Sequence, residues 1–324
     1  MDIWLQFISA LDSTVRLATP LILCAMAGLF SERSGIVDIG LEGKMLAGAF
    51  AAAAVTALTG SILLGLLCAV FVSICMALLH GFACITHTGD QVVSGLAINI
   101  LAAGLTVVLG IAWFHRGGQT PSLTSDQRFG PLTWPLSEQV RDIPVLGPLY
   151  SELLSGHNLL VYMAFLAIPL TAWIVYRTRF GLRLRAVGEN PQAVDTAGIS
   201  VAWLRYRAVI MAGVLCGLAG AYLSIALGAG FVKDMSAGKG YIALAALIFG
   251  KWRPVPALFA CLLFGFLEAM STRLQGVDLP LLGQIDVQLM QALPYVLTVI
   301  LLAGFIGRAV APKAIGKPYL KDRA

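Results

Sequence analysis

Charged residues are scarce in this sequence. Only 12% of its 324 residues are Asp, Glu, Lys or Arg, while 58% are hydrophobic; soluble domains usually carry about 25% charged residues. A soluble fold built from such a chain would lack the polar surface that water requires. The hydrophobic residues instead form long blocks, and roughly 20 such residues are enough to cross the hydrocarbon core of a bilayer. We therefore expect a membrane protein.

Signals of several other protein classes are also missing. The first ten residues contain no Lys or Arg, so they lack the basic start of a cleaved signal peptide, and we expect the first hydrophobic segment to be retained. The six cysteines include no CxxC pair, which argues against a disulfide framework or a zinc ribbon. The basic residues flank the hydrophobic blocks and form no single patch, so nucleic acid is not an expected partner. No nucleophile and base are evidently paired, so we expect neither an enzyme nor a cofactor.

Nine hydrophobic segments can be read along the chain: 14–30, 36–58, 61–80, 91–114, 158–177, 206–228, 238–250, 254–271 and 289–306. The seventh is too short for an upright span, so it is expected to extend upstream, to be re-entrant or to form half of a broken helix. The sequence therefore predicts an all-α fold. We expect a polytopic transmembrane bundle of about nine helices, one or two of them short or broken, that forms a single domain over residues 1–324.

The distribution of Lys and Arg predicts the orientation, because cytoplasmic loops are enriched in these residues. The loop 178–205 with its flanks and the tail after the ninth segment are strongly basic, whereas acidic residues outnumber basic ones in the loop 115–157. We therefore expect the loop 178–205 and the C-terminus in the cytoplasm and the loop 115–157 outside. Nine spans then place the N-terminus outside, unless residues 3–13 form an additional interfacial helix.

A short helix is predicted within the loop 178–205. Asn190 suits the N-cap position, Pro191 the first helical position, and Gly198 the stop. A helix of about two turns is too short to be stable alone in water. It is therefore held by its flanks and available to dock on another protein, or it is an ordinary capped turn of a loop. The residues themselves leave both interpretations open.

Five charged residues fall within the stretch 31–44, between two hydrophobic runs: Glu32, Arg33, Asp38, Glu42 and Lys44. Charged side chains within a membrane are costly, so they tend to line cavities or to pair with one another. Several glycines in the stretch also allow the backbone to break. Two interpretations are equally favoured: a broken helix beside the permeation path, and an interfacial loop with paired charges.

Small and polar residues form one stripe on the fourth segment: Gly95, Asn99, Ala102 and Thr106. Such a stripe lines a pathway or, more commonly, makes a close helix contact. Asn99 is the best single candidate for a hydrogen bond to a solute, because its side-chain amide both donates and accepts. The predicted pathway residues are Glu42, Gln91, Asn99 and Thr106, with Gln91 the weaker candidate.

Two contacts between segments are also predicted. Gly213, Gly217 and Gly220 give the spacing of a helix-packing face on the sixth segment. Glu268 is expected to pair with Arg273 at the end of the eighth.

No metal site is expected. His80, Cys84 and His87 share one helical face, but a tetrahedral site needs a fourth ligand and none is evident.

The loop 178–205 resembles the coupling-helix segment of ABC importer permeases in the ribose, galactose and nucleoside branch. Members show the pattern R-[ST]-x-x-G-x-x-[IL]-x-A-x-G-x-N-x-x-A-A, matched here by Arg177, Thr178, Gly181, Leu184, Ala186, Gly188, Asn190 and Ala193. Val194 stands where a second Ala is frequent. The stretches 28–50 and 89–106 resemble the same branch, particularly its nucleoside permeases, and 238–254 does so more loosely.

The resemblance implies a permease subunit of an ATP-driven importer in the bacterial inner membrane, most similar to those for nucleosides. Its implied partners are a second related permease, an ABC ATPase subunit and an extracytoplasmic substrate-binding protein. The chain has no Walker A motif, so ATP is expected to bind the partner. The implied coupling residues are Arg185, Glu189, Asn190, Pro191, Asp195 and Gly198. A simple-sugar permease and an ion-coupled secondary transporter remain alternatives, although the latter gives the capped helix no role.

Overall fold

The computed structural model of this chain describes residues 3–134, 146–274 and 310–320, with a few isolated positions between 278 and 300. Its longer helices are α1 (Ile3–Arg33), α2 (Leu41–Thr59), α3 (Ile62–Gly81), α4 (Gln91–Phe114), α7 (Leu159–Arg177), α8 (Arg179–Glu189), α10 (Val201–Tyr222), α11 (Lys239–Phe249) and α12 (Pro254–Leu274). The shorter elements are η1 (Phe82–Thr86), η2 (Ser125–Gln127), α6 (Leu146–Pro148), η3 (Leu149–Leu154), α9 (Pro191–Thr196), η4 (Leu223–Leu227) and the antiparallel pair β1 (Asp278–Leu279) and β2 (Gly283–Gln284). Apart from this pair, the described residues form the all-α fold that the sequence predicts.

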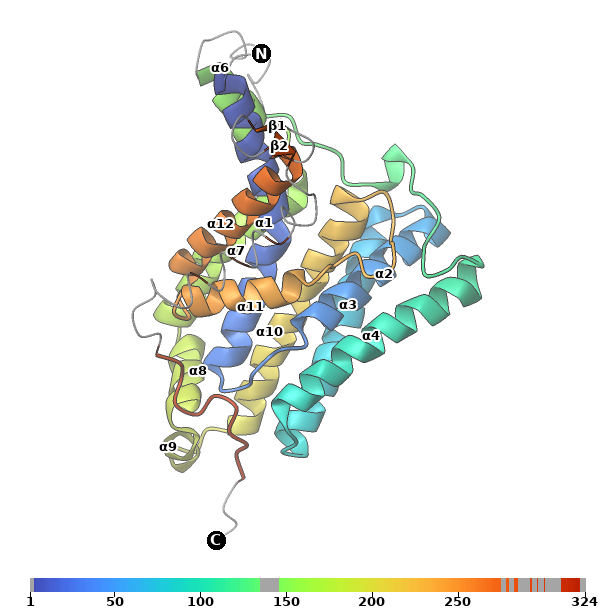
Figure 1. Cartoon of the computed structure of the whole chain (residues 1–324). Coiled ribbons are helices and arrows are strands. Elements are labelled where there is room, and N and C mark those ends of the chain that lie inside the picture. The colour runs from blue at the N-terminus through green and yellow to red at the C-terminus, as the bar shows by residue number, and fades with distance from the viewer. Residues whose placement is uncertain are drawn as a thin grey trace.

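Among the described residues, seven helices are long and apolar enough to cross a membrane: α1, α2, α3 with η1, α4, α7, α10 with η4, and α12. Each coincides with a predicted segment, and α4 has the predicted bounds. The seventh predicted segment, 238–250, forms the short helix α11, which has only 11 residues. Figure 1 shows α11 lying across the direction of α1 and α10. The ninth predicted segment, 289–306, falls almost entirely outside the described residues. The expected count of about nine spans is therefore not confirmed.

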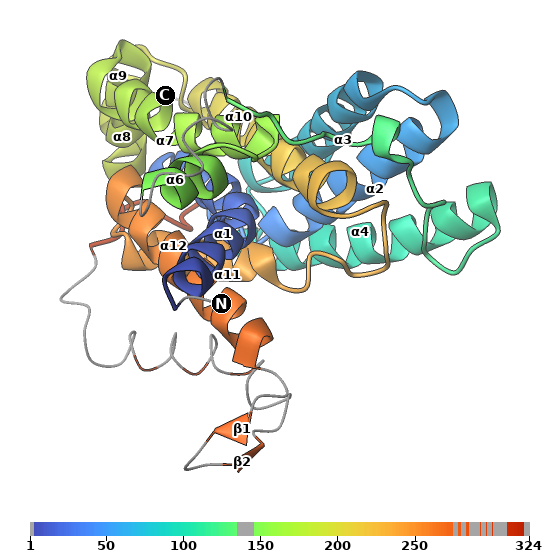
Figure 2. The ribbon, with the colours of Figure 1, turned by 90° about the horizontal axis from the view of Figure 1, so that it is seen from above.

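Three helices form the centre of the bundle. The apolar stretches of α1, α2 and α10 are 78%, 78% and 72% buried, against 28% for α3 and α4. α10 packs on α1, α2 and α3, and α1 also packs on α7, α11 and α12. Figures 1 and 2 both place α4 on the opposite side of the bundle from α8 and α12. Much of α4 is therefore left uncovered by the described chain.

The first helix is longer than the predicted segment 14–30. No Gly or Pro interrupts residues 3–19, and the hydroxyls of Ser13 and Thr14 donate to carbonyls of the preceding turn. The chain therefore continues as one helix from Ile3. Residues 3–13 are the start of the first span and not a separate interfacial helix.

The predicted short helix is present as α9. The side chain of Asn190 accepts a hydrogen bond from the amide of Ala193 at 3.1 Å, and Pro191 occupies the first turn. Gly198 follows with φ of +76°, a left-handed conformation that favours glycine. This local geometry confirms the prediction from cap residues. The preceding helix α8 was not predicted.

The glycine face of α10 is confirmed as a packing face. A Cβ added at Gly217 would lie 2.6 Å from the Cα of Val70 on α3. One added at Gly220 would lie 2.3 Å from the backbone oxygen of Met45 on α2. Backbone atoms occupy the space on this side of α10, so α10 approaches α2 and α3 as closely as glycine permits.

Gly220→Val is therefore expected to destabilise the bundle by about 3 kcal/mol, because the backbone of α2 has to move to admit the side chain. The apparent melting temperature of the purified protein in detergent measures the effect. Gly104→Val is the matched control, since nothing lies within 4 Å of a Cβ at that glycine of α4. Equal losses of stability in the two variants would contradict this packing.

The predicted pair of Glu268 with Arg273 is wrong. Glu268 lies 2.5 Å from the ammonium of Lys239 on α11, and Arg273 donates to the hydroxyl of Ser9 on α1 at 2.6 Å. On a helix, residues three or four apart are neighbours, whereas a spacing of five turns the two side chains apart. The partners come from other helices.

Candidate functional site

The turn between α1 and α2 brings together buried charges. The ammonium of Lys44 lies 2.5 and 2.6 Å from the two carboxylate oxygens of Asp38, and both side chains are fully buried. Burial acts to raise the pKa of the Asp38 carboxyl, but the Lys44 ammonium, the His80 ring and hydrogen bonds from Lys44 and Ser31 together lower it more, so the pKa lies below its usual value. The chain breaks here between α1 and α2, as the interpretation of a broken helix predicts. Asp38 and Lys44 also form an ion pair, as the interpretation of a loop with paired charges predicts.

Glu42 holds the beginning of α11. One carboxylate oxygen accepts from the amide of Gly238 at 2.8 Å, and the other accepts from the amide of Gly240 at 2.6 Å. A carboxylate is favourable there because the first amides of a helix have no partner within it. A Cβ at Gly240 would lie 2.5 Å from the amide nitrogen of Glu42. The predicted pathway residue thus positions a neighbouring helix.

Asn99 joins three segments through its side-chain amide. Its oxygen accepts from the amide of Gly43 at 2.8 Å. Its nitrogen donates to the carbonyl of Ile39 at 3.1 Å and to the hydroxyl of Tyr241 at 2.7 Å. Because both amide hydrogens are used, the free donor at this point is the hydroxyl hydrogen of Tyr241.

A polar pocket of about 330 Å³ opens beside these groups. Its lining residues are Glu42, Gly43, Leu46, Asn99, Ile100, Ala103, Asp234, Ser236, Ala237, Gly238 and Tyr241. The volume lies at the small end of the range for ligand sites, about 300–1,000 Å³. The pocket therefore offers the carboxylate of Asp234 and the hydroxyls of Ser236 and Tyr241 to a small molecule, in a lining that is otherwise mostly apolar. The side chains of Glu42 and Asn99 are already hydrogen-bonded and fix its shape.

Sequence reasoning missed the part of the pocket that precedes and begins α11. Asp234 and Ala237 there have φ of +55° and +46°, which is uncommon for residues other than glycine. Strained backbone of this kind is concentrated at functional sites. The only signal in the sequence was a polar interruption, Lys233 and Asp234, between two hydrophobic segments.

The other two predicted pathway residues lie elsewhere. Gln91 is buried and accepts from the amide of Val37 at 2.6 Å. Thr106 donates to the carbonyl of Ala103 at 3.1 Å and lines a separate, apolar cavity of about 110 Å³ between α2, α3 and α4. The structure therefore brings Glu42 and Asn99 together, and leaves Gln91 and Thr106 outside the polar pocket.

Of the three residues considered for a metal, both histidines have other contacts, and the Sγ of Cys84 lies 3.7 Å from Nδ1 of His80. The ring nitrogens of His80 lie 3.0 Å from the Ser94 hydroxyl and 3.1 Å from the Val37 carbonyl. The ring of His87 packs edge-on against Phe82. Within the described residues, no group of three or more His, Cys, Asp and Glu side chains is placed to hold a metal ion.

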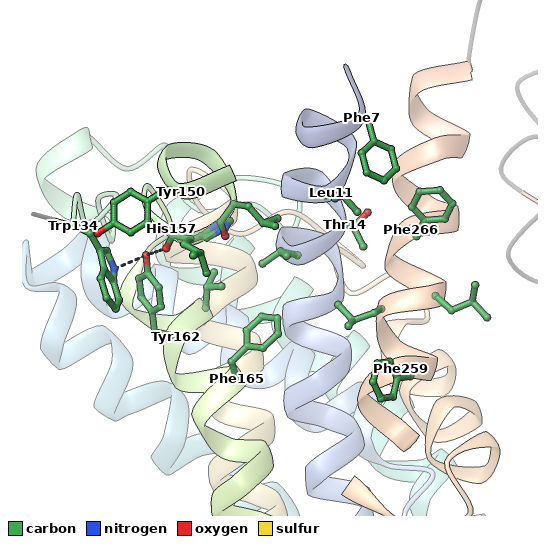
Figure 3. Close-up of a pocket in the computed structure, with 16 residues that line it drawn as sticks. Phe7, Leu11, Thr14, Trp134, Tyr150, His157, Tyr162, Phe165, Phe259 and Phe266 are labelled. Atoms are coloured by element: carbon green, nitrogen blue, oxygen red, sulfur yellow. Dashed lines mark hydrogen bonds between the residues drawn. The ribbon is translucent and has the colours of Figure 1, made fainter. Parts of the chain in front are cut away.

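A larger cavity of about 980 Å³ lies between α1, α7, α12 and η3. Figure 3 shows aromatic side chains from these elements around it, with Trp134 donating to the hydroxyl of Tyr162 at 3.0 Å. None of its lining residues is Asp, Glu, Lys or Arg. Burial lowers the pKa of His157 below its usual value, despite the nearby Asp12 carboxylate. This lining suits hydrocarbon and not a polar solute.

The predicted coupling residues gather at the end of the bundle where α1 ends. Glu189, Asn190 and Pro191 line one groove, and the guanidinium of Arg185 lies 5.2 Å from the centre of the Tyr176 ring. The side chain of Val194 holds α9 against the neighbouring helices, because it packs in a buried cluster with Val187, Val201 and Leu204. The position that departs from the family pattern is therefore a packing contact.

The chain is similar to known transporter permeases over nearly its whole length. A family described as branched-chain amino acid transport system / permease component matches residues 10–303. The chain is 41% identical to the guanosine ABC transporter permease protein NupQ of Bacillus subtilis, over 100% of both chains. It is 38% identical to the nucleoside ABC transporter permease protein NupC of Lactococcus lactis, over 94% of this chain and 95% of that one. It is also 36% identical to the putative glucose ABC transporter permease protein TsgC13 of Haloferax volcanii, over 96% of this chain and 97% of that one.

Proposed function

Because this chain belongs to the branched-chain amino acid transport system / permease component family, we propose that it forms the membrane path of a nucleoside importer. Members of this family are multi-pass ABC transporter permeases, and the chain is therefore a permease and not an enzyme. The single observation that carries the proposal is the polar pocket at Glu42, Asn99 and Tyr241 within an apolar bundle. Likeness over the full length to permeases named for guanosine and nucleosides supports the choice of solute.

The pocket supplies the groups that a nucleoside needs. The hydroxyl of Tyr241 accepts from Asn99 and keeps its own hydrogen for a base or ribose oxygen. Asp234 and Ser236 add an acceptor and a hydroxyl to the same lining. A monosaccharide presents similar hydroxyls, and the likeness to a putative glucose permease makes a sugar the second candidate.

The importer we propose contains further chains. A second related permease completes the path, two ABC ATPase subunits bind at the cytoplasmic end, and a binding protein delivers the solute outside. The C-terminus of this chain lies in the cytoplasm in this arrangement, together with α8 and α9. ATP binding closes the ATPases on each other and moves the docked α9, and the attached α8 transmits this motion to α7 and α10. The pocket then opens alternately to the two sides.

ATP-driven uptake of labelled guanosine into proteoliposomes tests this function. The complex purified with its partners is expected to accumulate guanosine when ATP is enclosed with the ATPases, and to continue when ionophores remove the ion gradients. Excess unlabelled adenosine should suppress the uptake, whereas excess glucose should not. Uptake that needs an ion gradient and ignores ATP would establish the secondary transporter instead, and suppression by glucose alone would establish the sugar permease.

A further inference from the structure

The segment 310–320 lies against the end of the bundle that carries α9 (Figure 1). Its backbone is fixed at three points. The amide of Ala314 donates to the carbonyl of Gly188 at 2.8 Å, and that of Gly316 donates to the carbonyl of Gly35 at 3.1 Å. The carbonyl of Lys317 accepts from Arg205 at 3.4 Å. Main-chain contacts therefore fix the path of this segment.

The same segment forms one wall of the groove beside α9. The groove has a volume of about 430 Å³, and its opposite wall consists of residues 189–192. Lys313 and Lys317 line it from the segment, and Glu189 lines it from the other side. Both lysines are exposed. Tyr319 packs against the buried cluster that contains Val194 of α9. Both walls of the groove therefore rest on the same hydrophobic cluster, which forms the base of the groove.

Arg205 ties this groove to the turn between α1 and α2. Its side chain is 1% exposed and also donates to the carbonyl of Ser34 at 3.2 Å. A Cβ at Gly188 would lie 2.2 Å from the carbonyl oxygen of Arg33. Because α2 begins at Leu41 and carries Glu42 in its first turn, the base of the groove connects to the polar pocket through one short turn.

We propose that the segment 310–320 is the second half of the docking surface for the ABC ATPase, and that an acidic patch of the ATPase seats between Lys313, Lys317 and α9. The inference rests on the proposed function, which assigns only α9 to docking. The groove is continuous with α9, and its two exposed cations attract a partner of opposite charge. An ATPase held on both walls pulls on α9 and on the turn before Glu42 together.

The double charge reversal Lys313→Glu/Lys317→Glu tests the proposal. The lysine side chains are exposed and the segment is held by its backbone, so the variant is expected to keep its melting temperature. Affinity of the ATPase subunit for the purified permease complex, in nanodiscs without anionic lipid, should fall about tenfold at low salt. Salt should weaken binding of the wild-type complex more than that of the variant, because part of the attraction is Coulombic.

Two further variants separate the possible outcomes. Lys251→Glu/Arg253→Glu makes the same charge change at another exposed site outside the groove and should leave the affinity within about twofold of the wild-type value, since surface charge alone contributes little. An equal loss in this control, or wild-type affinity in the groove variant, overturns the proposal. A defect that arises only when anionic lipid is added also overturns it, in favour of a lipid headgroup. Asn190→Ala tests α9 separately: normal binding by both α9 and groove variants would contradict the proposed function, while a defect in Asn190→Ala alone would contradict only this inference.

Discussion

Lys44→Met is expected to lower the free energy of unfolding by about 3–5 kcal/mol, the cost of leaving a buried charge without its partner. Both members of the Asp38–Lys44 pair are fully buried, with 2.5 Å between the ammonium and the nearer carboxylate oxygen. Removing the ammonium leaves the Asp38 carboxylate with no cation at hydrogen-bond distance among the described residues. Unfolding of the purified protein in mixed micelles, followed by circular dichroism, measures the loss.

The double variant Asp38→Leu/Lys44→Met is the control for this prediction. Replacing both ions removes the desolvation cost together with the attraction, and such exchanges are neutral or stabilising by about 1–4 kcal/mol in other proteins. The double variant is therefore expected to be more stable than Lys44→Met. If instead the double variant is less stable than Lys44→Met, the stability of the turn does not depend on the pairing of these charges.

Gly198→Val is expected to reduce ATP-driven uptake at least tenfold while ATP hydrolysis and membrane insertion persist. At φ of +76° any L side chain is strained, at a cost of roughly 1–2 kcal/mol, and the end of α9 has to rearrange. A helix of six residues depends on its caps, so α9 loses its geometry. A tenfold loss corresponds to about 1.4 kcal/mol of coupling. Uptake and hydrolysis measured on the same proteoliposomes give the ratio directly.

Gly60→Val is matched to this variant. Gly60 has φ of +72° and ends α2 at the opposite end of the bundle, where a Cβ would meet only a side-chain atom at 4.0 Å. Its strain is similar but its distance from α9 is large, so uptake per ATP hydrolysed should remain that of the wild type.

Pro191→Ala is expected to uncouple in the same direction as Gly198→Val. Normal uptake by both α9 variants would remove the argument that α9 transmits the motion.

The fold could be predicted wherever a local rule decided the structure. Length and hydropathy placed seven spans, and the cap residues Asn190 and Pro191 placed α9. The helix α8 was missed because its arginines gave it the appearance of a basic loop. Its buried face, Gly181, Leu184, Val187 and Gly188, recurs at helical spacing, so periodicity favoured a helix although glycine is a poor helix former.

The site could be predicted only in part, because its contacts join distant segments. Asn99 and Tyr241 are 142 positions apart, and the short helix α11 brings them together. Helical periodicity put Thr106 on the face of Asn99, but seven residues at about 1.5 Å each separate them by about 10 Å along the helix. Gln91 lies about 12 Å away in the other direction for the same reason. The three residues therefore lie at different levels of α4, and only Asn99 lines the polar pocket.

The accessibility of a cysteine at position 237 tests most directly whether the polar pocket belongs to the path. Ala237 is exposed and lines the pocket at Glu42 and Tyr241. The Ala237→Cys complex is expected to react with a membrane-impermeant maleimide from outside in the resting state, and at least tenfold more slowly when guanosine is bound or ATP closes the ATPases. Gln119→Cys, in the predicted external loop, should react alike in every state. Reaction at position 237 that ignores both guanosine and ATP would contradict the account, because the solute would then cross elsewhere.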